Sequence, residues 1–181
     1  MNKKFVIGLA SMLLSTQVSA QNIDKSKILI AYYSLSGNTK EIAQQIQKET
    51  NGDLFSIELK TPYPSDYDEQ TKKAKEELSN GTLPPLKSKV ENIADYDIVF
   101  IGTPVWWGTA STPVRTFVSE NDLTGKKVIP FITHGGGGKD KTVTDLTSLC
   151  KGCDVEQNSY VTYGRTGKNL SSWVKEVMSE K

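Results

Sequence analysis

The chain has 181 residues, of which 36% are hydrophobic and 24% are charged, and its formal net charge is +1. This length and hydrophobic content allow one domain with a substantial core, and they exclude a disordered or collagen-like chain. The balanced charge gives no basic footprint for nucleic acid, and one histidine with two cysteines supplies too few ligands for an ordinary zinc site. We therefore expect neither a nucleic-acid partner nor a bound metal.

The first 20 residues have the order of features of a secretory signal peptide. Lys3 and Lys4 form a positive start, residues 5–14 form an apolar segment, and residues 18–20 have small side chains where a signal peptidase cuts. The apolar segment is too short for a stable membrane anchor, and no cysteine follows the cut to carry a lipid. We expect an exported protein, periplasmic or secreted, that divides into residues 1–20 (signal peptide, removed), 21–26 (lead-in) and 27–181 (folded domain).

Apolar runs predict five strands in the rest of the chain. Residues 27–33, 97–102 and 127–133 are almost continuously apolar, as in parallel strands buried on both faces. Residues 53–59 alternate between apolar and polar, which is typical of a strand near a sheet edge. Residues 155–162 form a weaker strand.

Five helices alternate with these strands. Helical apolar spacing or helix start signals predict a helix that ends near Thr50, a mostly solvated helix over 66–78, and helices beginning at 111–113, over 142–149 and over 170–178. Alternating strands and helices indicate an α/β three-layer sandwich with a five-stranded parallel sheet and helices on both faces. The order 2-1-3-4-5 is the expected strand order, and it brings the loops after the first, third and fourth strands together.

The first of these loops is a strand-to-helix turn rich in hydroxyl groups. Its side chains and backbone N–H groups point toward the start of a helix, where the helix dipole favours a phosphate or another anion. No lysine or arginine lies within it, so neutral dipoles would hold the anion. The candidate ligand-binding residues are Ser34, Leu35, Ser36, Gly37, Asn38 and Thr39.

The second loop carries two adjacent tryptophans. Neighbouring residues of an extended segment point to opposite sides, so Trp106 and Trp107 cannot both face one core. We expect one of them to be exposed or to cover a flat aromatic ligand. The candidate residues of this loop are Thr103, Pro104, Val105, Trp106, Trp107 and Gly108.

The third loop consists of one histidine and four glycines. The glycines let the backbone approach a ligand closely, and the histidine charge would act on any redox group beside it. The candidate residues are His134, Gly135, Gly136, Gly137 and Gly138.

Together, Y-S-L-S-G-N-T-K, G-T-P-V-W-W-G and T-H-G-G-G-G resemble the flavodoxin family, closest to its short single-domain members, over residues 27–181. The resemblance implies a flavodoxin-like fold, FMN as cofactor, no catalytic residues of its own, and an electron carrier that serves a redox partner protein. The chain departs from long flavodoxins in two ways. Its glycine loop lacks the aromatic residue that commonly covers the flavin, and the chain lacks the strong acidity with which long flavodoxins dock basic redox partners. We expect a monomer or a weak dimer.

Two other functions remain open. An FMN-dependent NAD(P)H:quinone or small-acceptor reductase would use the uncovered ring face, although no separate G-x-G-x-x-G motif is present. A hydrolase would pair Ser34 or Ser36 with His134, although G-x-S-x-G is absent. A receiver domain is excluded because the third strand ends without a phosphoacceptor aspartate.

Cys150 and Cys153 lie at the end of the helix over 142–149. In an exported protein they are expected to form a short structural disulfide. The alternative is a dithiol that exchanges electrons, but reactive thiolates gain stabilisation at helix N-termini rather than C-termini.

Overall fold

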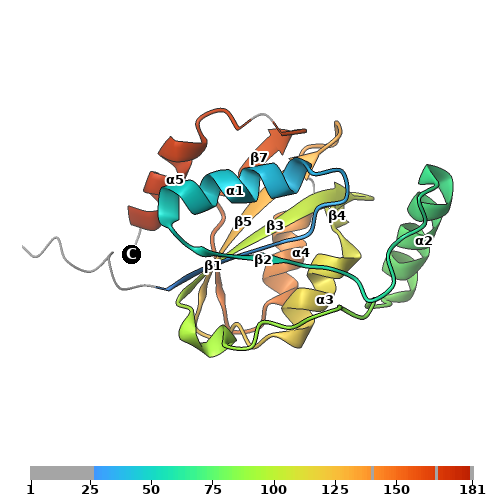
Figure 1. Cartoon of the computed structure of the whole chain (residues 1–181), viewed down its shortest axis with the longest axis horizontal. Helices are drawn as coiled ribbons and strands as arrows, with labels where there is room; N and C mark the ends of the chain where they lie inside the picture. The colour runs from blue at the N-terminus through green and yellow to red at the C-terminus, as the bar shows by residue number, and fades with distance from the viewer. Residues whose placement is uncertain (1–26, 140, 166, 180–181) are drawn as a thin grey trace, which may run out of the picture.

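The computed structural model describes residues 27–139, 141–165 and 167–179 (Figure 1). The predicted signal peptide and lead-in lie outside these residues. In the described part of the chain, every helix is too short or too polar to cross a membrane.

The centre of the fold is a mostly parallel sheet with the strand order β2-β1-β3-β5-β6. The predicted order is therefore right along this path. The predicted count of five is wrong, because the sheet over the described residues has seven strands. The strands are β1 (Ile28–Tyr32), β2 (Asp53–Ser56), β3 (Ile98–Trp106), β4 (Thr109–Ala110), β5 (Lys127–His134), β6 (Asp154–Val155) and β7 (Tyr160–Tyr163).

The two strands beyond the predicted five arise in different ways: one from the division of the expected fifth strand, and one from a hairpin. β6 and β7 both pair with β5 in parallel and are the two halves of the expected fifth strand. The ladder is interrupted opposite Pro130, which has no N–H group to donate. β4 pairs with β3 antiparallel and closes a hairpin in the segment that was predicted as a loop.

Four helices cover the two faces of the sheet (Figure 1). α1 (Asn38–Thr50) and α5 (Leu170–Ser179) pack on one face, and α3 (Thr112–Glu120) and α4 (Thr142–Leu149) pack on the other. Alternate residues of β1 enter the two cores, with Leu29 on the α3 and α4 side and Ile30 on the α1 and α5 side. Burial on both faces explains why the central strands are continuously apolar.

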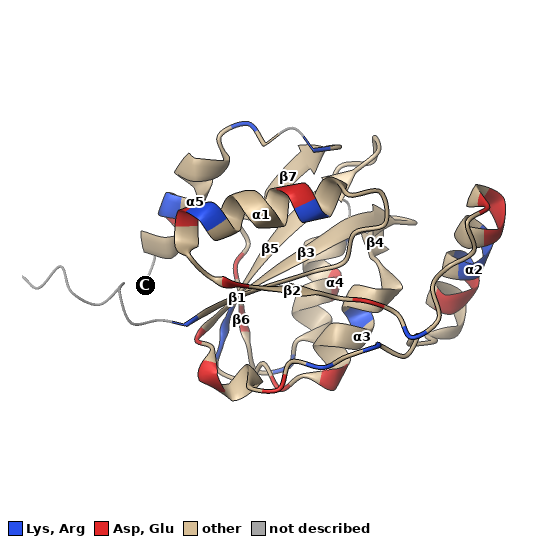
Figure 2. Cartoon of the chain, in the orientation of Figure 1, with Lys and Arg blue, Asp and Glu red and all other residues tan. Residues whose placement is uncertain are grey.

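The remaining α-helix, α2 (Tyr67–Asn80), stands beside the carboxyl ends of the strands, at the right of Figure 1, and a short 3-10 helix, η2 (Ile93–Asp95), precedes β3. The side chain of Asp66 caps its N-terminus by accepting from the N–H of Glu69. The prediction of a solvated helix fits most of its surface, but Ala74 and Glu77 are buried. Both charge signs are interspersed along it (Figure 2).

Candidate functional site

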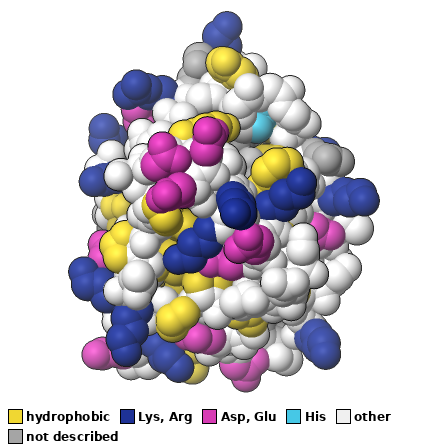
Figure 3. Space-filling model, turned by 90° about the vertical axis from the view of Figure 1, so that its right-hand side faces the viewer, with side chains coloured by type: hydrophobic (Ala, Val, Ile, Leu, Met, Phe, Trp, Pro, Cys, Tyr) yellow, Lys and Arg dark blue, Asp and Glu magenta, His cyan; other side chains and the backbone are white. Residues whose placement is uncertain are grey.

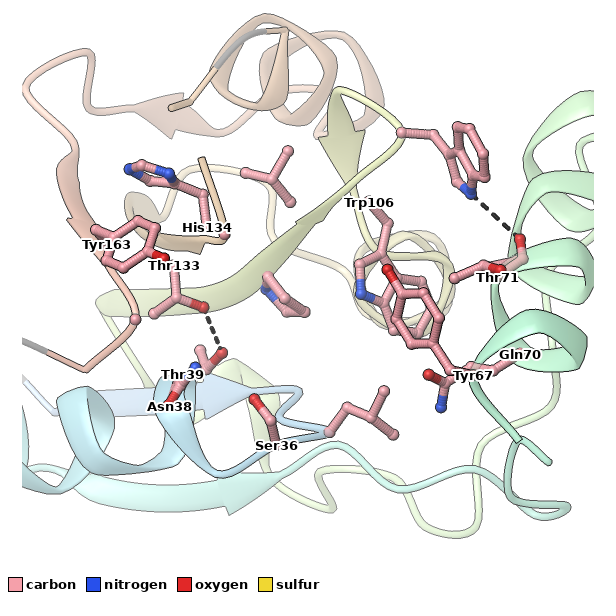
Figure 4. A pocket seen from close by; sticks show the side chains of 17 residues that line it. Ser36, Asn38, Thr39, Tyr67, Gln70, Thr71, Trp106, Thr133, His134 and Tyr163 are labelled. Carbon is pink, nitrogen blue, oxygen red and sulfur yellow. Dashed lines mark hydrogen bonds between the residues drawn. The ribbon is translucent and has the colours of Figure 1, made fainter. Parts of the chain in front are cut away.

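A cavity of about 760 Å³ opens at the carboxyl ends of the strands. Figure 4 shows Ser36, Asn38 and Thr39 on one side with Thr133, His134 and Tyr163, and Trp106 on the other side with residues of α2. The lining contains no Lys, Arg, Asp or Glu. It consists of Leu35, Ser36, Asn38, Thr39, Tyr67, Gln70, Thr71, Ala74, Pro104, Val105, Trp106, Trp107, Thr133, His134, Gly135, Tyr163 and Gly164.

The turn between β1 and α1 presents unmet hydrogen-bond donors. Gly37, with a φ of 88°, precedes the helix and supplies no side-chain cap. The first backbone bond of the helix runs from the N–H of Glu41 to the carbonyl of Gly37, so the preceding N–H groups have no partner in the helix. The buried hydroxyl of Ser34 also lacks a partner among the described residues. This arrangement suits an anion.

The two tryptophans belong to a β-hairpin. β3 continues through Trp106, and Trp107 and Gly108 form a two-residue turn with φ values of 51° and 79° before β4. Positive φ at both central residues is typical of the type I′ turn that matches the twist of paired strands. The predicted loop over 103–108 is therefore strand up to Trp106.

The two indole rings point in different directions, as predicted. Trp106 is half-buried and makes edge-on contacts with Tyr33 at 5.5 Å and Tyr63 at 5.2 Å between ring centres. Trp107 is 58% exposed, and its Nε1 donates to the carbonyl of Thr71 at 3.2 Å. Both rings line the cavity.

Four of the predicted residues in the first two loops do not line the cavity. They are Ser34, Gly37, Thr103 and Gly108. The Thr103 hydroxyl accepts from the N–H of Ser111 at 3.0 Å, and the Gly108 carbonyl accepts from the N–H of Lys141 at 3.0 Å. These bonds fix the hairpin against the starts of α3 and α4.

The glycine loop reaches the cavity only at its start. His134 and Gly135 line it, whereas Gly136, Gly137 and Gly138 do not. The N–H of Gly136 donates to His134 Nδ1 at 3.1 Å, and the imidazole lies edge-on to the ring of Tyr163 at 5.9 Å. The histidine is therefore oriented by its own loop and by the end of β7.

A family model described as flavodoxin matches residues 27–177. The chain belongs to the flavodoxin family. The resemblance read from the three loops is thereby confirmed, and so is the flavodoxin-like fold.

Solved structures agree with this family membership. A candidate flavoprotein of Bacteroides eggerthii is 31% identical with a TM-score of 0.73, and the match covers 86% of this chain and 99% of that one. A flavoprotein of Lactobacillus acidophilus, solved in complex with FMN, is 25% identical with a TM-score of 0.66, over 82% of this chain and 98% of that one. A flavodoxin from Archaea is 15% identical with a TM-score of 0.55, over 84% and 93% of the two chains, and shows the fold.

In this flavodoxin family member, α2 supplies cavity residues that the sequence analysis missed. Tyr67, Gln70, Thr71 and Ala74 lie on one helical stripe, with the spacing i, i+3, i+4 and i+7. The sequence contains this spacing, but the many charged residues of the helix led to the prediction of a mostly solvated helix. Thr133, Tyr163 and Gly164 were also missed, although extending the strand-end argument to the fifth strand would have included the last two.

The rim of the cavity is apolar and exposed. Among the described residues, four of the five exposed large hydrophobic side chains also line the cavity, namely Leu35, Tyr67, Trp107 and Tyr163. Figure 3 shows the face at the right of Figure 1, where exposed hydrophobic side chains lie between acidic and basic ones. The cavity is thus open to a flat ligand or to a partner surface.

Proposed function

We propose that this protein is an electron carrier that binds FMN and exchanges electrons with a redox partner protein. The observation that carries the proposal is the uncapped start of α1 at one end of an uncharged cavity with aromatic walls. A phosphate-bearing aromatic cofactor needs both features in one site. FMN is that cofactor, and it supplies the redox chemistry when bound.

The residues present fit FMN at both ends of the cavity. Toward the phosphate, the unmet N–H groups at the start of α1 are donors without an acceptor, and the preceding turn also holds the buried hydroxyl of Ser34, which has no partner among the described residues. Toward the ring, Trp106 and Trp107 provide aromatic surface. A volume of about 760 Å³ also lies within the usual range for cofactor sites.

The role of this chain is to bind FMN and control access to it. Ser36, Asn38 and Thr39 would hold the phosphate with neutral dipoles, so the cradle adds no positive charge to the site. His134 does not have the partner that a hydrolase needs, because its Nδ1 accepts from Gly136 rather than facing a carboxylate. Both points favour a carrier.

The exposed rim favours one second candidate, an FMN-dependent NAD(P)H:quinone or small-acceptor reductase. A small planar acceptor would reach the cavity past Tyr67 and Trp107, which are 74% and 58% exposed. Steady-state turnover of NADH or NADPH with a quinone distinguishes the two candidates. A rate no faster than that of free FMN favours the carrier.

The carrier proposal has a direct test. The purified protein is mixed with FMN, desalted and examined for flavin absorbance, and the holoprotein is then titrated with a reductant of known potential. Retained flavin and a reversible midpoint support the proposal. Loss of all flavin on desalting would overturn it.

The proposal extends to the partner, the assembly and the export of the protein. The mixed charges on the face shown in Figure 3 favour a partner that docks on the apolar rim, so its association should depend little on salt. We expect a monomer or weak dimer by sedimentation. Export would be tested by sequencing the N-terminus of protein from the native host, where a start at Gln21 is the expected result.

A further inference from the structure

Glu77 is the only buried Asp or Glu in the described part of the chain, and only 7% of it is exposed. None of the ion pairs among the described residues includes it. A buried carboxylate without a cation costs several kcal/mol of solvation free energy unless hydrogen bonds compensate. That cost is comparable to the whole free energy of unfolding of a small domain. Its presence needs a reason.

Two hydroxyl groups and a helix start compensate this charge. Glu77 Oε2 accepts from the Thr112 hydroxyl at 2.7 Å and from the Tyr63 hydroxyl in a short contact. Thr112 is the first residue of α3, so the carboxylate also lies near the positive end of that helix dipole. The three residues come from α2, from the loop before it and from α3.

The position of Glu77 on α2 connects it to the cavity. The cavity-lining stripe of this helix runs through Tyr67, Gln70, Thr71 and Ala74, and Glu77 is the next member of the same stripe, three residues after Ala74. An apolar residue would fill this place at lower cost. Here the stripe ends in a negative charge instead.

A chain of contacts leads from Glu77 to the wall of the cavity. The ring of Tyr63, whose hydroxyl bonds Glu77, contacts Trp106 edge-on at 5.2 Å, and Trp106 lines the cavity. The negative charge of Glu77 also acts on Tyr33, which directly precedes the phosphate turn. It adds to the effect of burial in raising the pKa of Tyr33. The carboxylate is therefore connected to the cavity wall through Tyr63, and it lies close enough to Tyr33, beside the phosphate turn, to act on that residue electrostatically.

We propose that Glu77 is a positioning residue of the FMN site, which fixes Trp106 through Tyr63 and lowers the reduction potential of bound FMN by its negative charge. The inference rests on the proposed function. Reduction adds negative charge to the flavin ring, which a nearby carboxylate opposes. At an effective dielectric constant of about 20, a unit charge on the order of 10 Å from a flavin ring would change the affinity for reduced relative to oxidised FMN roughly tenfold.

The test compares three variants. Glu77→Gln keeps the shape and removes the charge, Tyr63→Phe keeps the charge and the ring but removes the hydroxyl that bonds Glu77, and Glu76→Gln removes an exposed charge from the same helix as a control. Urea unfolding of the apoprotein, the Kd of oxidised FMN and the midpoint potential are measured for each. For Glu77→Gln we expect a higher potential, equivalent to roughly tenfold tighter binding of reduced relative to oxidised FMN. For Tyr63→Phe we expect several-fold weaker binding of oxidised FMN, and for Glu76→Gln no change.

The outcomes separate this inference from the proposed function. If the wild-type protein binds no FMN, the proposed function fails, and near-UV circular dichroism of the apoprotein still tests the positioning of Trp106 in Tyr63→Phe. A folded Glu77→Gln protein with wild-type potential and Kd would overturn the inference. If Glu77→Gln does not fold, Tyr63→Phe decides, since a wild-type Kd together with a wild-type aromatic signal contradicts the proposed link.

Discussion

The hydroxyl oxygens of Thr39 and Thr133 lie 2.9 Å apart in a buried contact between the first turn of α1 and the end of β5. Thr39 belongs to the turn that presents donors for a phosphate, and Thr133 immediately precedes His134. Both side chains also line the cavity (Figure 4). The contact thus fixes two of the three loops of the site relative to each other.

Thr133→Val keeps the shape of the side chain but leaves the Thr39 hydroxyl without its partner. We expect the free energy of unfolding of the apoprotein to fall by about 1–3 kcal/mol, the usual cost of a buried unsatisfied group. The double variant Thr39→Val/Thr133→Val should lose less than the sum of the two single variants, because both partners are then apolar. Urea unfolding of the four proteins measures this cycle. Strict additivity would contradict the contact, and exposed Thr144→Val serves as a neutral control.

Trp107 and Trp106 should respond differently to substitution. Trp107 has a φ of 51°, a conformation that a bulky residue adopts only under strain of about 1–2 kcal/mol and that asparagine tolerates. Trp107→Asn relieves that strain and loses two exposed contacts, the bond to Thr71 and the approach of Lys75 Nζ to its ring at 4.7 Å. We therefore expect the unfolding free energy of the apoprotein to change by less than about 1 kcal/mol.

Trp106→Ala provides the contrast. It removes a half-buried ring that touches Tyr33 and Tyr63, so we expect a loss of about 2–4 kcal/mol. Both variants should bind FMN more weakly, as measured by titration with the purified apoproteins. A large stability loss in Trp107→Asn would show that the turn is not strained.

The sequence predicted the central architecture because the apolar patterns there are unambiguous. Continuous apolar runs such as 97–102 are typical of strands buried on both faces, and with the alternating helices they predicted the parallel sheet. The strand order was predicted from the doubly wound arrangement that brings the three loops together. The hairpin at Trp107 was missed because β4 is only two residues long and carries no apolar pattern. The contribution of α2 was missed because periodicity says which side of a helix is apolar, not where a long connection places that helix.

Gly102 should tolerate no side chain. A Cβ at this position would lie 2.2 Å from Cζ of Phe131 and 2.8 Å from Cβ of Tyr32 on the neighbouring strands. We expect Gly102→Ala to lower the free energy of unfolding by about 3 kcal/mol, as in overpacked cores. Phe131→Leu should recover part of the loss in the double variant. Gly135→Ala, where the added atom meets open space, is the matched control and should leave stability unchanged.

The disulfide between Cys150 and Cys153 should stabilise the fold without taking part in electron transfer. It closes the C-terminal end of α4 next to β6, which pairs with the start of β5, whereas the cavity lies beside the end of β5. For so short a loop we expect Cys150→Ser/Cys153→Ser to cost about 2 kcal/mol in urea unfolding under oxidising conditions. The midpoint potential of bound FMN should not move. A shift in that potential, or oxidation of the dithiol coupled to FMN reduction, would instead support the redox-active alternative.

The buried tyrosines predict how stability changes in alkaline solution. Burial, together with the carboxylate of Glu77, raises the pKa of both Tyr33 and Tyr63. In the unfolded chain these phenols ionise near pH 10. Because the folded-state pKa is the higher one, the contribution of each tyrosine is complete below pH 10 and is lost as pH rises above it. We expect the free energy of unfolding to fall above pH 10. The slope of this fall against pH reports the number of protons released on unfolding, and that number should be smaller by one in Tyr63→Phe and by two in Tyr33→Phe/Tyr63→Phe. Urea unfolding between pH 8 and pH 11.5 measures these slopes. Equal slopes in the wild-type and double-variant proteins would contradict the prediction, because the two hydroxyls would then ionise as readily in the folded protein as in the unfolded chain.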